Sequence, residues 1–118
     1  MKKKELKVNE SLSNYKDAQE YWVTFGGKYS DGVKELIRRW DSEWFVDLIL
    51  ASQINPPLST TEFQVWTLSK LQNDTYLIEA TDDRKNPIYE KVVDYCTFKS
   101  DGVRLLCISG TILLPSEF

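Results

Sequence analysis

Three carboxylates are spaced so that they could act together. Glu43 and Asp47 are four residues apart, which places two side chains on one face of a helix, and Asp41 lies near the same end. Carboxylates held close together can do acid–base chemistry or hold Mg²⁺, although a solvated acidic helix face is the alternative interpretation. Asp47 stands out because Val46 and Leu48 flank it in an apolar run. A partly buried carboxylate there would need a partner, so Asp47 ranks first among the candidate binding residues.

Other catalytic chemistry finds little support. The chain has no histidine, and therefore lacks the commonest general base and the commonest transition-metal ligand. No G-x-S-x-G motif is present, and a serine or cysteine nucleophile would depend on a lysine or a carboxylate as its base. Cys96 and Cys107 are too few for a structural zinc site, and residues 26–28 lack the spacing of a phosphate-binding loop. We therefore expect no catalytic residue, no metal and no cofactor.

Aromatic residues are the strongest compositional signal. They make up 13% of the chain and include four tryptophans. A core built from large side chains would explain them, but Trp and Tyr also dominate the hot spots of protein interfaces. Two neighbouring arginines lie on the polar side of a predicted helix, where they could pair with Asp47 or touch nucleic acid. Besides Asp47, the candidate binding residues are therefore Trp22, Trp40, Trp44, Trp66, Arg38 and Arg39.

Charge is distributed unevenly along the chain. The net charge is −3, but residues 1–16 contain five lysines against two glutamates, which leaves an acidic remainder. An acidic body argues against wrapping a long polyanion, whereas the basic start could touch nucleic acid. Residues 1–14 are predicted to be a flexible basic arm. No secretory signal is recognisable and no apolar stretch is long enough to cross a bilayer, so we expect a cytoplasmic protein with no membrane contact.

The hydrophobic pattern predicts an α+β fold in which residues 15–118 form a single domain. Residues 17–25 are predicted to form a short helix. A second helix runs from residue 33, restarts near Asp41 and Ser42, and ends at Asn55-Pro56-Pro57. The remainder predicts strands over residues 62–70, 75–80, 88–98, 103–108 and 111–114. We expect two or three N-terminal helices packed on an antiparallel meander of about five strands. An apolar edge at residues 111–114 would favour homodimerisation.

Several stretches of the sequence are similar to those of a known protein family. They are residues 29–34 (YSDGVK), the residues Trp44, Asp47, Ile49 and Gln53, residues 62–68 (EFQVWTL), and residues 111–118 (TILLPSEF). In this order they resemble an uncharacterised family of short bacterial proteins that are often encoded on mobile elements. The resemblance covers residues 17–118 and implies the extent of the domain, without implying an activity.

These observations favour a small non-enzymatic protein-binding module, with a connection to mobile elements or to anti-defence proteins. Its expected partner is another protein or a second copy of itself. One alternative is a nucleic-acid-binding protein that uses the basic arm together with Arg38 and Arg39. The other is a carboxylate-based metal-dependent enzyme that uses Asp41, Glu43 and Asp47.

Overall fold

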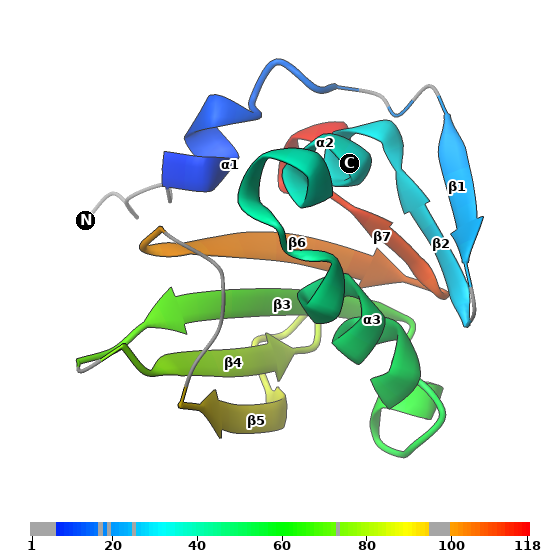
Figure 1. Ribbon diagram of the computed structural model, residues 1–118. Coiled ribbons are helices and arrows are strands. Elements are labelled where there is room, and N and C mark those ends of the chain that lie inside the picture. Colours follow the sequence, from blue (N-terminus) through cyan, green and yellow to red (C-terminus); the bar gives the residue numbers. More distant parts are fainter. Residues whose placement is uncertain (1–6, 17, 19, 25, 73, 95–99) are drawn as a thin grey trace.

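The computed structural model describes residues 7–16, 18, 20–24, 26–72, 74–94 and 100–118. Within them lie the helices α1 (Lys7–Ser11), α2 (Asp31–Trp40) and α3 (Glu43–Ser52), and the short 3-10 helices η1 (Leu58–Thr60) and η2 (Pro115–Glu117). The strands are β1 (Tyr21–Thr24), β2 (Gly27–Ser30), β3 (Phe63–Lys70), β4 (Tyr76–Thr81), β5 (Pro87–Val93), β6 (Gly102–Ile108) and β7 (Thr111–Leu113). They form one mixed sheet in the order β1-β2-β7-β6-β3-β4-β5, and α2 and α3 lie on one side of it (Figure 1).

The α+β class is confirmed, but the strand arrangement is more complex than the predicted meander of about five antiparallel strands. β3, β4 and β5 do form an antiparallel meander. β6 then returns to pair with β3, and β7 pairs with β6 on one side and in parallel with β2 on the other. β7 is therefore an interior strand. The prediction of an exposed apolar edge at residues 111–114 was wrong, and the homodimer expected through that edge loses its basis.

The β1–β2 hairpin accounts for this difference. Residues 17–25 were predicted to be a helix, whereas Tyr21–Thr24 form a strand that pairs with β2, with Tyr21 opposite Ser30. The exposure of residues 21–24 alternates, as it does in a strand with one covered face. Gly26, with φ +94°, lies in the turn before β2. The β-branched pair Val23-Thr24 fits this strand better than a helix.

The helix α1 packs into the folded domain, although residues 1–14 were predicted to be a flexible arm; residues 1–6 of that arm lie outside the described residues. Val8 and Leu12 lie four residues apart and are almost fully buried in the hydrophobic core. Between them, Asn9 donates from Nδ2 to the Arg104 carbonyl and accepts from the Arg104 N–H, both at 2.8 Å. Arg104 lies beyond the last residue of β6 that pairs with β7, so the Asn9 amide makes the hydrogen bonds that a neighbouring strand would make there.

The two long helices follow the prediction closely. Ser30 caps α2 by accepting from the Val33 N–H at 3.2 Å. Asp41 ends α2 in the left-handed region with φ 49°, and Ser42 precedes α3. Both helices pack their apolar residues on one face of the sheet. No described helix covers the opposite face, on which Phe63, Val65 and Thr67 remain half-buried.

Gln64 connects the sheet to the end of α3. Its side chain exchanges two hydrogen bonds with the Gln53 amide, at 2.8 and 2.9 Å, and donates to the Leu58 carbonyl at 3.0 Å. Its Oε1 also accepts from Nε1 of Trp66 at 2.9 Å. Gln64 and Trp66 are 1% and 0% exposed. The middle of the EFQVW stretch is therefore a buried structural network.

The C-terminal stretch meets the start of α2 through Glu117. This buried carboxylate accepts from the Ser30 hydroxyl, from the Gly32 N–H at 3.2 Å and from the Leu114 N–H at 2.9 Å. A Cβ on Gly32 would lie 2.6 Å from Cδ1 of Leu114 and 2.8 Å from Cδ of Glu117. The YSDGVK and TILLPSEF stretches thus fit against each other, and the glycine makes the close approach possible.

This cluster predicts a pH-dependent stability. Burial raises the pKa of Glu117 above its ordinary value of 4.5, and the neighbouring Asp31 raises it further, although the hydrogen bonds it accepts oppose the rise. Because the folded-state pKa exceeds the unfolded one, the contribution to stability is complete below the unfolded value and is lost as the pH rises through the folded value. We expect urea unfolding to show this decline above pH about 4.5 and Glu117→Gln to flatten it. The exposed Glu90 provides a control, because Glu90→Gln should leave the slope unchanged. An identical slope in Glu117→Gln and the unmodified protein would contradict this assignment.

Candidate functional site

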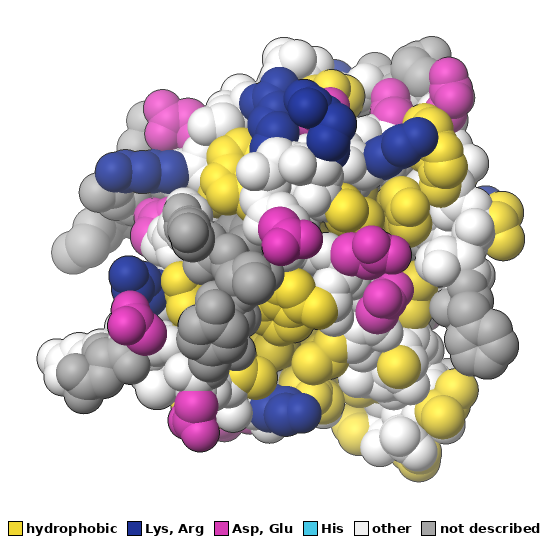
Figure 2. Space-filling model, in the orientation of Figure 1, with side chains coloured by type: hydrophobic (Ala, Val, Ile, Leu, Met, Phe, Trp, Pro, Cys, Tyr) yellow, Lys and Arg dark blue, Asp and Glu magenta, His cyan; other side chains and the backbone are white. Residues whose placement is uncertain are grey.

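Most of the residues predicted to bind a partner lie on the helix side of the sheet. We call this the helix-side surface and define it by Trp22 of β1, by Lys34, Arg38, Arg39 and Trp40 of α2, and by Trp44 and Asp47 of α3. Figure 2 shows a cluster of basic side chains over α2, acidic side chains beside it toward α3, and hydrophobic side chains between and around them. The surface therefore combines apolar contact area with charges of both signs.

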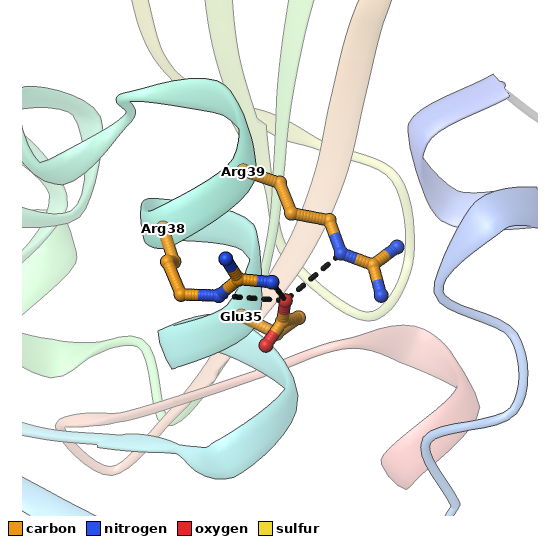
Figure 3. Close-up of polar contacts among 3 residues, drawn as sticks. All are labelled: Glu35, Arg38 and Arg39. Atoms are coloured by element: carbon orange, nitrogen blue, oxygen red, sulfur yellow. Dashed lines mark hydrogen bonds and ion pairs between the residues drawn. The ribbon is translucent and has the colours of Figure 1, made fainter.

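Arg38 and Arg39 are held together by one carboxylate (Figure 3). Glu35 Oε1 accepts from Nε of Arg38 and from Nε of Arg39, each at 2.9 Å, and also from Nη2 of Arg38. The hydrogen bonds from the two arginines lower the pKa of Glu35, and Glu35 raises the pKa of Arg38. The two arginine side chains are 70% and 41% exposed, so the ion pairs add little stability. Their main consequence is that the two guanidinium groups lie side by side with one net positive charge.

Two tryptophans of this surface lie next to cations. Nζ of Lys34 is 3.9 Å from the ring centroid of Trp22, which joins α2 to β1. Cζ of Arg39 is 6.0 Å from the ring centroid of Trp40. Both tryptophans are half-buried, so part of each residue is packed and part stays accessible to a partner.

The other two tryptophans differ in their surroundings. Trp44 is half-buried with its ring 5.7 Å from that of Phe45, and within the described part of the chain its buried Nε1 has no hydrogen-bond partner. Trp66 is 0% exposed and packs against Tyr89, with ring centroids 5.0 Å apart. Trp66 is therefore a core residue, and its predicted role as an exposed anchor was wrong. The alternation of β3 turns it toward the helices.

The candidate carboxylates are all on the surface. Asp41, Glu43 and Asp47 are exposed, so Asp47 is not the partly buried group that its apolar neighbours suggested. The helix turns Asp47 outward while Val46 faces the core. Among the residues that the structure describes, no group of three or more His, Cys, Asp or Glu residues is arranged to hold a metal ion. The structure thus does not bring these three carboxylates together as a metal site.

Sequence reasoning missed Lys34. Its position over Trp22 depends on the pairing of β1 with β2, and the pattern had assigned Trp22 to a helix. The spacing of Lys34 and Arg38, four residues apart on one helix face, was the only available signal.

Two further observations concern the cysteines and the helices. Cys107 is a free, buried thiol, and burial raises its pKa to about 11, so it is inert as a nucleophile at neutral pH. Cys96 lies outside the described residues. In the described part of the chain, no helix has the length and apolar character that crossing a membrane requires.

Comparison with known proteins gives one match. The model of a family of unknown function, DUF6876, matches residues 6–118. Searches of the curated proteins and of the solved structures returned no match. The resemblance to a family of unknown function is confirmed at this level, whereas its bacterial and mobile-element origin stays a prediction. The match begins one residue before α1, which agrees with the inclusion of that helix in the fold.

Proposed function

Since the chain belongs to the DUF6876 family, a family of unknown function, we propose its function from its surface: a non-enzymatic protein-binding module that contacts its partner through the helix-side surface. The observation that carries the proposal is that half-buried Trp22 and Trp40 lie next to exposed Lys34 and Arg39, and that Arg38 is held beside Arg39 by one carboxylate. Tryptophan and arginine are the residues that most often supply binding energy in protein interfaces. A preformed aromatic edge also loses little conformational freedom on binding.

A protein fits this surface better than a nucleic acid does. Arg38 and Arg39 share the charge of Glu35, and exposed Glu43 and Asp47 follow on α3. Each phosphate neutralised by a protein requires a basic side chain, and acidic neighbours weaken that attraction. Mixed charges around apolar area instead suit a protein partner, because they fix its orientation.

The proposal includes a cytoplasmic location, which the free thiol of Cys107 supports, because disulfides are rare in a reducing compartment. A link to mobile elements or to anti-defence proteins rests on the resemblance of residues 17–118 alone.

Affinity capture from a lysate of the source cells tests the proposal. We expect one protein to be recovered in stoichiometric amount, with recovery unchanged by nuclease treatment. Trp40→Ala and the double variant Arg38→Ala/Arg39→Ala should each reduce recovery at least about tenfold, because hot-spot truncations cost about 2 kcal/mol or more. Lys91→Ala, an exposed change on β5, is the matched control and should bind normally.

Other outcomes separate the alternatives. Recovery that disappears with nuclease would favour nucleic-acid binding. Recovery of an untagged second copy would identify the partner as the chain itself. Equal recovery by the surface variants and by Lys91→Ala would contradict the placement of the interface.

A further inference from the structure

The face of the sheet opposite α2 and α3 contains a hollow of about 430 Å³. Its floor consists of side chains from three neighbouring strands, β4, β3 and β6, and the turn between β4 and β5 forms one rim. Hydroxyl, charged and apolar side chains all contribute to its lining. The residues used below are Phe63, Val65, Thr67, Glu79 and Arg104.

One acidic and one basic residue, Glu79 and Arg104, lie in one row across the floor of this hollow. Thr67 pairs with Glu79 of β4 on one side and with Arg104 of β6 on the other. Because neighbouring strands are about 4.8 Å apart, the Cα atoms of Glu79 and Arg104 are separated by about 10 Å with Thr67 between them. Both side chains line the hollow, yet within the described residues they form no ion pair with each other.

Arg104 is the less usual of the two charges. It is half-buried, and in the described part of the chain its guanidinium has neither a hydrogen-bond acceptor nor an ion-pair partner. A guanidinium without an acceptor favours a carboxylate, which it can bind through two parallel hydrogen bonds. Its backbone is held in place by both hydrogen bonds to Asn9, so the side chain starts from a fixed point on β6.

The hollow also has an apolar end. Phe63 and Val65 precede Thr67 on the same face of β3 and are half-buried. The ring of Phe118 lies edge-on to that of Phe63, with centroids 5.5 Å apart. A ligand whose charged groups meet Arg104 and Glu79 can therefore extend an apolar body over these residues.

We propose that this hollow binds a small zwitterion with an apolar body, of the α-amino acid type. Its carboxylate binds the Arg104 guanidinium, its ammonium group binds the Glu79 carboxylate, and its side chain packs on Phe63 and Val65. This site is independent of the helix-side surface, since it lies on the opposite side of the sheet.

Titration followed by two-dimensional NMR tests the site, with L-leucine as the probe. We expect saturable shifts of β3, β4 and β6 amides up to about 10 mM leucine, the range expected for a ligand of few atoms. N-acetyl-leucine lacks the ammonium group and leucinamide lacks the carboxylate, so each should bind at least tenfold more weakly because one charge-assisted contact is lost.

Substitutions test the roles of Arg104 and Glu79 in binding the ligand. Arg104→Gln and Glu79→Gln should each weaken leucine binding at least about tenfold. Arg84→Gln is the control, because Arg84 is exposed in the β4–β5 turn and does not line the hollow. The spectrum of each variant reports its folding, and Glu79→Gln tests the site even where Arg104→Gln is unfolded. Absence of saturable shifts with leucine, or equal binding by Glu79→Gln and the unmodified protein, would overturn the proposal.

Discussion

Gly102→Ala is expected to destabilise the fold by at least about 3 kcal/mol, which is a large share of the stability of a domain of this size. Gly102 begins β6 with φ +148°, a conformation that residues with a side chain rarely adopt. A Cβ built there would lie 2.0 Å from the carbonyl oxygen of Leu68. That oxygen belongs to the backbone of β3, so the clash is relieved only by separating β6 from its neighbour. Urea unfolding followed by circular dichroism measures the loss.

Gly110→Ala is the matched control for this variant. Gly110 also has a positive φ, +81°, but no atom lies within 4 Å of the position of a Cβ. Only the backbone preference is then lost, and we expect a cost of about 1–2 kcal/mol. Equal destabilisation by the two substitutions would contradict the packing of Gly102 against Leu68.

Trp66→Ala has the second large expected effect, a loss of about 3–5 kcal/mol of unfolding free energy. Trp66 heads the set of largest fully buried side chains in the described chain, and its removal leaves a cavity between the sheet and the helices. It also removes the donor that Nε1 presents to Gln64. Because Gln64 joins β3 to Gln53 and to the Leu58 carbonyl, the damage extends to the end of α3.

Trp66→Phe separates the two contributions. Phenylalanine keeps much of the buried volume but donates no hydrogen bond, so we expect a smaller loss of about 1–3 kcal/mol. Thermal unfolding of both variants gives the comparison. A Trp66→Ala protein that melts with the unmodified one would show that this residue is not in the core.

Local sequence signals predicted α2, α3 and the strands from β3 to β7 well. The helical periodicity of α2 and α3, the break between them near Asp41, and the alternation of β3 can each be recognised from the residues of the element itself. What failed depends on pairing between distant segments. β6 pairs with β3 across about forty residues, and β1 exists as a strand because β2 covers one of its edges. Neither strand pairing can be recognised from the periodicity of the sequence.

The same limit explains the beginning of the domain. Residues 7–12 follow a lysine-rich start and are mostly polar themselves, and only Val8 and Leu12 indicate an apolar face. Their burial depends on β6, together with the two hydrogen bonds of Asn9, nearly a hundred positions later. Short helices acquire most of their stability from such contacts rather than from their own sequence.

The candidate site, like the fold, could be predicted only in part. Tryptophan and arginine composition predicted which residue types to follow, and Arg38, Arg39 and Trp40 do lie on one helix. Composition could not separate the core residue Trp66 from the surface residues Trp22 and Trp40, because exposure depends on the partner elements. The stretches that carried the family resemblance proved largely structural, since Gly32 meets Glu117 and Gln53 meets Gln64. Asp47, in contrast, remains exposed and free to contact a partner.

Site-specific photo-crosslinking tests the central claim most directly, namely that the helix-side surface is where a partner protein binds. A photo-crosslinking amino acid would replace Arg38 in one variant, Asp47 in a second and Lys91 in a third, all of which are exposed positions. The account predicts a covalent adduct with one protein from positions 38 and 47, and none from position 91 on β5. An adduct formed from position 91 but not from positions 38 and 47 would contradict it.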